Sequence, residues 1–159
     1  WLRLRLLSWY HVNLLLMRHG EAEQRQTTDY ARSLTAVGCG EVLEAAALVR
    51  QRQLFIDRTL VSPYVRARQT ADLMVEALGL QAAKICSDIT PDSTPVGACH
   101  ALEELLANSK IALAVMHQPI ISQLILYLTG IKQPMATANI VLLEVPVLER
   151  ECCDLICVL

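Results

Sequence analysis

The sequence is poor in aromatic residues, which make up only 4% of its 159 positions, although 53% of the residues are hydrophobic. A folded core must therefore be built from leucine, valine, isoleucine and alanine. No uninterrupted apolar run reaches the ~18 residues that a membrane-spanning helix requires. The longest candidate, PIISQLILYLTG, is interrupted by Ser122 and Gln123 and is typical of a buried helix. This composition argues against disorder and indicates a globular chain.

The sequence also lacks a strong net charge and a metal-binding cysteine pattern. The formal net charge is −2, so there is no basic field for nucleic acid or an anionic membrane, and any anion site must be local. The six cysteines are scattered without C-x-x-C spacing, which favours reduced thiols in a cytoplasmic protein. We therefore expect a cytoplasmic protein with no metal, no cofactor, no nucleic-acid partner and no membrane association.

The length suits one domain. The first twelve residues, WLRLRLLSWYHV, interleave arginine with leucine but are too short and too interrupted for a secretory signal. We expect residues 1–12 to be an N-terminal extension or a cloning remnant, and residues 13–159 to form a single domain.

Short apolar runs alternate with segments of helical periodicity. The pattern predicts strands over 13–17, 58–62, 111–116, 139–145 and 152–159, and helices over 34–53, 63–79, 95–108 and 119–128. Thr35 and Thr94 are expected N-caps, Pro63 is expected in the first turn of its helix, and Gly79 is expected to end that helix. Gly38 and Gly40 weaken the first helix unless close packing requires them. The alternation predicts an α/β fold, a three-layer α/β/α sandwich with a mainly parallel sheet.

Cationic and imidazole side chains follow three of the predicted strands. Arg18 and His19 follow the first, Arg66 follows the second, and His117 and Gln118 follow the third. Ligands of open α/β sheets bind beyond the carboxyl ends of the strands, so these side chains are expected to meet at one rim. Apart from Glu21, we expect no carboxylate directly beside the two arginines. Such a pocket suits an anion with several oxygen atoms.

The residue types fit phosphoryl transfer. Arginine can hold two phosphate oxygens in a forked geometry, and a neutral imidazole nitrogen is a nucleophile near neutral pH. Fixed cationic donors stabilise the charge that gathers on the phosphoryl oxygens in the transition state. The sequence lacks a P-loop, an Asp-rich metal cluster and C-x5-R, which argues against three other classes of phosphoryl-transfer enzyme.

Four segments carry a resemblance to a known family. LLLMRHGEAE, LVSPYVRARQTA and AVMHQP resemble the motifs of the histidine phosphatase (phosphoglycerate mutase-like) superfamily. DYARSLTAVG resembles the D-x-x-R-x-L-T-x-x-G segment of its SixA branch of small phosphohistidine phosphatases. The likeness extends from about Asn13 to Val145 and implies a phosphoglycerate mutase-like fold.

By this resemblance His19 is the nucleophile that becomes phosphorylated, and three residues hold the phosphoryl group: Arg18, Arg66 and His117. The resemblance also implies three further substrate-binding residues: Gly20 through close backbone packing, Arg32 at the rim, and Gln118 through its backbone. A local carbonyl is expected to fix the tautomer of His19. Three other motif residues are expected to orient Arg66 or cap its helix: Ser62, Gln69 and Thr70.

Two features favour a phosphohistidine substrate. The connection GLQAAKICSDITPDSTPVG is short, so we expect an open site that admits a side chain of another protein. This connection also lacks a clear glutamate general acid, which an imidazole leaving group needs less than an alkoxide does. Asp88 and Asp92 lie in the connection, and Asp88 is interpreted as a loop or cap residue.

The hypothesis is a metal-independent, monomeric protein phosphohistidine phosphatase of a two-component relay. Its expected partner is a phosphorylated histidine-containing phosphotransfer domain or a sensor kinase. The alternatives are a small-molecule phosphomonoesterase of the same superfamily and a non-catalytic phosphoprotein-binding module.

Overall fold

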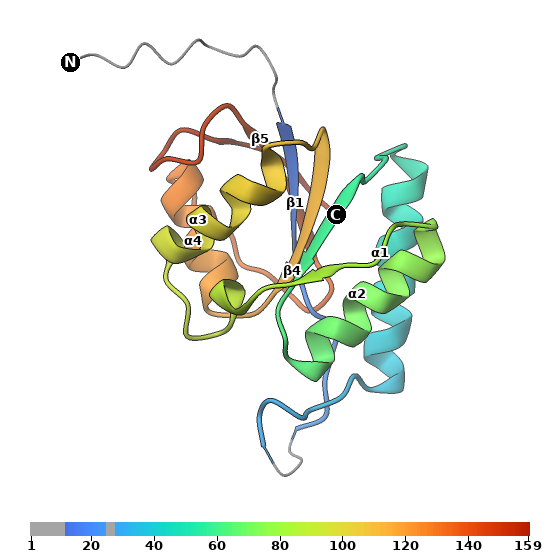
Figure 1. Cartoon of the computed structure of the whole chain (residues 1–159). Coiled ribbons are helices and arrows are strands. Elements are labelled where there is room, and N and C mark those ends of the chain that lie inside the picture. The colour runs from blue at the N-terminus through green and yellow to red at the C-terminus, as the bar shows by residue number, and fades with distance from the viewer. Residues whose placement is uncertain (1–11, 25–27) are drawn as a thin grey trace, which may run out of the picture.

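The computed structural model describes residues 12–24 and 28–159. Six strands form one sheet in the order β3-β2-β4-β1-β5-β6 (Figure 1). The strands are β1 (Val12–Arg18), β2 (Arg58–Val61), β3 (Lys84–Ile85), β4 (Ile111–Met116), β5 (Ile140–Val145) and β6 (Asp154–Val158). The first four in spatial order pair in parallel, whereas β5 is antiparallel to both β1 and β6. The prediction of a mainly parallel sheet is confirmed.

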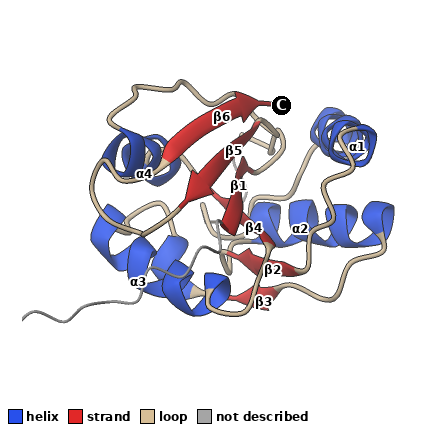
Figure 2. Ribbon diagram, turned by 90° about the horizontal axis from the view of Figure 1, so that it is seen from above, coloured by secondary structure: helices blue, strands red, loops and turns tan. Residues whose placement is uncertain are grey.

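Four α-helices cover the two faces of the sheet. They are α1 (Ala36–Gln51), α2 (Val65–Leu78), α3 (Pro95–Leu106) and α4 (Ile120–Thr129). Figure 2 shows α1 and α2 on one side of the sheet and α3 and α4 on the other. Alternate residues of β1 supply the two cores, because Leu14 and Leu16 face α3 and α4 while Leu15 and Met17 face α1 and α2. The three-layer α/β/α architecture is therefore confirmed.

The helix ends follow the sequence signals at most positions. The hydroxyls of Thr35 and Thr94 accept hydrogen bonds from the amides of Gly38 and Gly97, as N-cap residues do. Gly79 ends α2 with a positive φ of 67°. The placement of Pro63 in the first turn of α2 was wrong.

Tyr64 is the N-cap of α2 and is extended (φ −63°, ψ 140°), so the helical turns begin only at Val65.

The connection between α2 and α3 contains structure that the sequence did not predict. Lys84 and Ile85 form β3 at the edge of the sheet, and a short 3₁₀ helix, η1 (Ser87–Ile89), follows within the predicted loop. A two-residue strand is too short to show an alternating pattern. At the other end of the chain, β1 begins at Val12, inside the segment expected to be an extension; residues 1–11 lie outside the described part.

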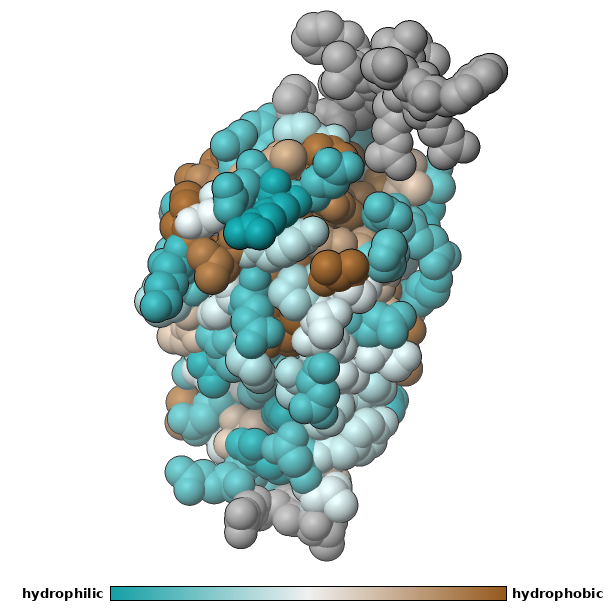
Figure 3. All heavy atoms as spheres, turned by 90° about the vertical axis from the view of Figure 1, so that its left-hand side faces the viewer, coloured by the Kyte–Doolittle hydropathy of each residue, from teal (hydrophilic) through white to brown (hydrophobic). Residues whose placement is uncertain are grey.

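None of the helices in the described ranges is long and apolar enough to cross a membrane. Figure 3 shows the side of the molecule that carries α3 and α4, where polar side chains are mixed with separate apolar patches. Val96 of α3 and Leu126 of α4 are among the exposed apolar residues.

Candidate active site

The carboxyl ends of β1 and β4 bring His19 and His117 together. Each histidine directly follows its strand, and the two strands are parallel neighbours. The amide of His19 donates to the carbonyl of Met116 at 3.1 Å, and its carbonyl accepts from the amide of Ala138 at 3.1 Å. The two imidazole ring centres are 5.0 Å apart. The backbone of His19 is thus fixed between the end of β4 and the loop that precedes β5.

The two ring nitrogens of His19 have different partners. Nδ1 lies 2.7 Å from the carbonyl oxygen of Gly20, and because a carbonyl only accepts, Nδ1 carries the proton. Nε2 accepts a hydrogen bond from Nε of Arg66 at 3.1 Å. Burial is the main cause that lowers the pKa of His19 to about 4. The hydrogen bond to Gly20 raises this pKa, whereas the charges of Arg66 and Arg18 lower it further. The ring is therefore neutral at pH 7, with the lone pair of Nε2 directed at the guanidinium.

His117 is the more deeply buried of the two histidines, with 1% of its surface exposed. Its Nε2 lies 2.7 Å from the hydroxyl of Ser62, whereas its Nδ1 is buried without a partner among the described residues. Burial is the main cause that lowers the pKa of His117 to about 2, and the neighbouring His19 and Arg66 lower it further. Ser62 therefore orients His117. The expectation that Ser62 orients Arg66 was wrong.

All three nitrogen atoms of the Arg66 guanidinium are engaged. Nε donates to His19, Nη1 donates to the carbonyl of Asp29 at 2.6 Å, and Nη2 donates to Oδ2 of Asp29 at 3.0 Å. A planar guanidinium has two forked edges, and Asp29 holds the Nη1/Nη2 edge. The Nε/Nη2 edge is thereby turned toward His19.

The expectation that no carboxylate except Glu21 lies beside the arginines was wrong. Glu21 accepts from the hydroxyl of Thr35 at 2.7 Å, whereas Asp29 binds Arg66 and also Arg32. Hydrogen bonds from Arg32 and Arg66 hold the pKa of Asp29 below its usual value, so its carboxyl group is ionised. In the sequence, the only sign that Asp29 binds an arginine is its position three residues before Arg32 in DYARSLTAVG.

Arg18 is half-buried and turns toward the loop before β5. Its Nη1 donates to the carbonyl of Met135 at 2.8 Å, and its Nε is buried without a partner in the described part of the chain. The side-chain amide of Gln118 donates to the hydroxyl of Ser122 at 2.8 Å and reaches the same Met135 carbonyl at 3.5 Å. Gln118 therefore helps to position this loop through its side chain, and Met135 is a site neighbour that no sequence motif indicated.

Arg32 lies at the outer edge of this group. Its guanidinium contacts Oδ1 of Asp29 at 2.9 Å and the carbonyl of Glu23 at 2.5 Å, and these contacts do not include His19. Its charge still contributes to lowering the pKa of His19. Arg32 thus anchors the rim carboxylate rather than lining the imidazole pair.

Gly20 allows the loop after β1 to touch α1. A Cβ atom at Gly20 would lie 2.6 Å from the carbonyl oxygen of Gly38, and one at Gly38 would lie 2.0 Å from that of Glu21. The hydroxyl of Thr70 accepts from the amide of Gly20 at 3.2 Å and donates to the carbonyl of Arg66 at 2.8 Å. The backbones of the segment that carries His19 and of α2 are thereby joined.

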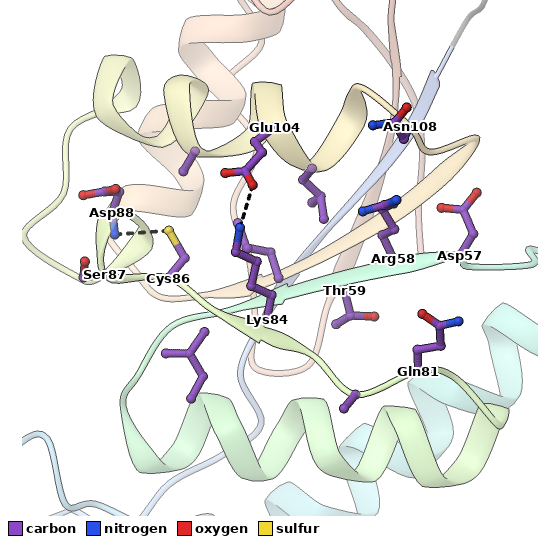
Figure 4. Close-up of a pocket in the computed structure, with 15 residues that line it drawn as sticks. Asp57, Arg58, Thr59, Gln81, Lys84, Cys86, Ser87, Asp88, Glu104 and Asn108 are labelled. Atoms are coloured by element: carbon purple, nitrogen blue, oxygen red, sulfur yellow. Dashed lines mark hydrogen bonds and ion pairs between the residues drawn. The ribbon is translucent and has the colours of Figure 1, made fainter.

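A separate cavity of about 650 Å³ lies beside β2, β3 and α3. Lys84 and Glu104 form an ion pair across it at 2.8 Å (Figure 4). Asp88, from η1, lies on its wall, and none of the predicted phosphate-site residues does. Asp88 lies inside the short helix η1, whose N-cap is Cys86, so the interpretation of Asp88 as a loop or cap residue was wrong in detail. In the described ranges, no three side chains of His, Cys, Asp or Glu gather as a metal site would require.

This arrangement can bind an oxyanion such as a phosphoryl group and can present a nucleophilic imidazole nitrogen to its central atom. A neutral imidazole nitrogen faces a buried guanidinium, a second neutral imidazole lies beside it, and Arg18 adds a second positive charge. Donors that are fixed before the reaction stabilise developing negative charge without reorganising.

Comparison with known proteins agrees with this geometry. Residues 14–88 match the sequence family described as the histidine phosphatase superfamily (branch 1). The chain is 32% identical over 134 residues to phosphohistidine phosphatase SixA of Escherichia coli K12, covering 80% of this chain and 81% of that protein. It is 31% identical over 135 residues to the SixA homolog of Haemophilus influenzae, covering 79% and 82%.

Among solved structures, the protein histidine phosphatase SixA in complex with tungstate superposes with a TM-score of 0.85 and 25% identity. The match covers 93% of this chain and 96% of that structure. The chain therefore belongs to the histidine phosphatase superfamily, in its SixA branch, and is a phosphatase.

Proposed function

We propose that this phosphatase hydrolyses phosphohistidine on a protein, through a covalent intermediate in which His19 itself is phosphorylated. The observation that carries the proposal is the orientation of the His19 ring. The Gly20 carbonyl holds the proton on Nδ1, so the lone pair lies on Nε2, where it accepts a hydrogen bond from Nε of Arg66. A bound phosphoryl group would take over this Arg66 donor and leave the lone pair of Nε2 to attack. The names of the relatives, two of them phosphohistidine phosphatases at more than 30% identity, support the same substrate class.

In the proposed first step, Nε2 of His19 attacks the phosphorus atom and the phosphorus–nitrogen bond of the substrate breaks. In the second step, water attacks the phosphorylated His19 and releases inorganic phosphate. Arg66 donates to the phosphoryl oxygens through its Nε/Nη2 edge. The buried Nε of Arg18 and Nδ1 of His117, which have no partner within the described residues, would each donate to one of these oxygens.

Positive charge from the chain itself supports this step. Arg18 and Arg66 neutralise the charge that gathers on the phosphoryl oxygens, so the proposed mechanism uses no metal ion. Because the His19 pKa is about 4, the nucleophile is already deprotonated at pH 7 and needs no general base.

The proposed partner is a phosphorylated histidine-containing phosphotransfer domain or a sensor kinase in the cytoplasm. The rim residues Asp29 and Tyr30 are exposed, so the imidazole of another protein could reach the buried pair of histidines. We further propose that the enzyme acts as a monomer.

The test compares phosphate release from three substrates at equal concentration: a phosphorylated histidine-containing phosphotransfer domain, a sugar phosphate and p-nitrophenyl phosphate. The proposal expects kcat/KM to be highest for the phosphotransfer domain. Fast turnover of the sugar phosphate without action on phosphohistidine would instead assign a small-molecule phosphatase. Tight binding of the phosphorylated domain without phosphate release would assign a binding module.

A further inference from the structure

A chain of aromatic rings leads from the buried histidines to the surface. The ring of Tyr64 lies 4.9 Å from that of His117, and the ring of Tyr30 lies 5.0 Å from that of Tyr64. His117 is buried, whereas Tyr30 has 47% of its surface exposed. In a protein with so few aromatic residues, three rings in sequence at the edge of the proposed phosphoryl site form a distinctive wall.

Tyr30 is held in place by contacts to the site itself. Its carbonyl accepts from the amide of Val65 at 3.1 Å, at the start of α2. The preceding residue, Asp29, binds the guanidinium of Arg66 through its carbonyl and its carboxylate. The Arg66 guanidinium also lies 4.9 Å from the ring centre of Tyr64. An exposed ring that is already ordered loses little conformational freedom when a ligand binds to it.

Asp29 adds a carboxylate to this rim. Its Oδ1 accepts from Arg32 and its Oδ2 accepts from Arg66, while 57% of the side chain remains exposed. A carboxylate oxygen can accept more than one hydrogen bond, so both oxygens retain capacity toward solvent. The rim therefore offers an aromatic face and an anionic acceptor side by side.

In an in-line attack by His19 the leaving group departs on the far side of the phosphorus atom, away from the buried imidazole. That side faces solvent, and Tyr30 and Asp29 are exposed residues at the edge of the site. Sugar alcohols have neither an aromatic ring nor a positive charge to use there. The leaving group of phosphohistidine is an imidazole, which is aromatic and can carry a proton on its second nitrogen. Rings of this kind stack on tyrosine, and their cations are attracted to its π face.

We propose that Tyr30 and Asp29 form the subsite for the protonated imidazole ring of the phosphohistidine substrate. Tyr30 stacks on the ring, and the Asp29 carboxylate accepts the N–H of the ring nitrogen that does not carry phosphorus. This inference rests on the proposed function and names how that substrate is selected.

The subsite removes the need for a separate general acid. The substrate ring enters with phosphorus on one nitrogen and a proton on the other, and therefore as a cation. When the phosphorus–nitrogen bond breaks, its electron pair stays with the ring, which leaves as neutral imidazole and keeps its proton. His19 forms the new bond through Nε2 and keeps its proton on Nδ1 at Gly20, so the positive charge passes from one ring to the other. No proton has to move.

The test measures kcat/KM for a phosphohistidine peptide and for phosphoramidate, which has the same phosphorus–nitrogen bond but no ring. In the Tyr30→Ala variant we expect the ratio of the two values, peptide over phosphoramidate, to fall about three- to tenfold. Tyr30→Phe keeps the ring and should restore the ratio. Phe55→Ala, which removes an aromatic side chain that is 81% exposed in the loop before β2, is the matched control and should leave it unchanged.

A second variant separates the two tasks of Asp29. Asp29→Asn should lower kcat/KM for both substrates, because Arg66 loses a charged partner, but more strongly for the peptide. An equal loss on both substrates would remove Asp29 from the subsite, and an unchanged ratio in Tyr30→Ala would overturn the subsite as a whole. A wild-type enzyme that does not hydrolyse the peptide at all would instead refute the proposed function, so the two failures are distinguishable.

Discussion

The residues of the site act in pairs. His19 depends on the Gly20 carbonyl for its tautomer, His117 depends on the Ser62 hydroxyl, and Arg66 depends on Asp29 for the edge that it presents. In each pair a neighbouring polar group fixes the side chain that would contact the phosphoryl group. Side chains held in this way contribute to catalysis without the cost of being ordered during the reaction.

Replacing Arg66 tests the donor that faces Nε2 of His19. Arg66→Ala should reduce transition-state stabilisation by about 2–4 kcal/mol, measured as the fall in kcat/KM. Arg68→Ala is the control, because Arg68 is an exposed arginine of the same helix, and its kcat/KM should stay near that of the wild type. Equal values for the two variants would place Arg66 outside the site.

The pKa of His19 can be measured directly. Burial and the neighbouring guanidiniums favour the neutral ring, so the NMR titration of His19 in the free enzyme should give a pKa of about 4. The His19 ring should therefore remain neutral from pH 7 down to pH 5. A titration midpoint near 6.5 would show that the ring is solvated and would contradict its placement between Gly20 and Arg66.

The sequence indicated the cationic and imidazole residues of the site because each directly follows a predicted strand or opens a helix. It did not indicate that Asp29 binds Arg66, that Ser62 binds His117, or that Met135 binds Arg18. Those contacts join segments far apart in the chain: 37 positions separate Asp29 from Arg66, and 117 separate Arg18 from Met135. No local spacing encodes such pairs.

At the scale of elements, two glycines in the first turns of α1 have opposite roles. A Cβ atom at Gly38 would lie 2.0 Å from the Glu21 carbonyl oxygen, in the loop that carries His19, whereas nothing lies within 4 Å of a Cβ at Gly40. Gly38→Ala should therefore lower the free energy of unfolding by about 1–3 kcal/mol through overpacking. Gly40→Ala should raise it by about 0.5–1 kcal/mol, because alanine is the better helix former.

Urea unfolding of the two variants measures this difference, and enzyme assays should show that only Gly38→Ala also loses activity. Similar stabilities for the two would mean that α1 does not pack against the loop after β1. From the sequence alone, both glycines weaken the helix unless close packing requires them. Only three-dimensional contact distinguishes one from the other.

Element boundaries were predicted best where a side chain marks them. Thr35, Thr94 and Gly79 cap helices as their residue types indicate. Pro63 gave a misleading signal because the next residue, Tyr64, is still extended. β3 was missed because its two residues become a strand only through pairing with β2.

At the scale of the whole molecule, the alternation of strands and helices predicted the layers but not the order of the strands. The position of β1 between β4 and β5 is set by pairing between distant segments. That order matters for function, because it makes the ends of β1 and β4 neighbours and thus brings His19 beside His117.

Burial of two neutral histidines should make the stability of the whole molecule depend on pH. The folded pKa values are about 4 for His19 and about 2 for His117, whereas an unfolded histidine titrates near 6.5. Below about pH 6.5 the unfolded chain binds protons that the folded chain does not. Folding stability therefore falls with decreasing pH, by up to about 1.4 kcal/mol per pH unit for each histidine.

Urea unfolding of the wild type and of His117→Asn at pH 7 and pH 5 tests this dependence. The loss of stability between these two values should be about 2 kcal/mol smaller in the variant, which has one fewer histidine to protonate on unfolding. Equal losses in the two proteins would mean that His117 is not held neutral in the folded state.

The central claim is that His19 carries the phosphoryl group during turnover. Its most direct test is to mix the enzyme with a phosphotransfer domain that carries ³²P on histidine, to quench within milliseconds in alkaline detergent, and to separate the two proteins. The account predicts a transient label on the enzyme that is stable in alkali, lost in acid and absent from His19→Ala. Phosphate release without any label on the wild-type enzyme, or an undiminished label on His19→Ala, would contradict it.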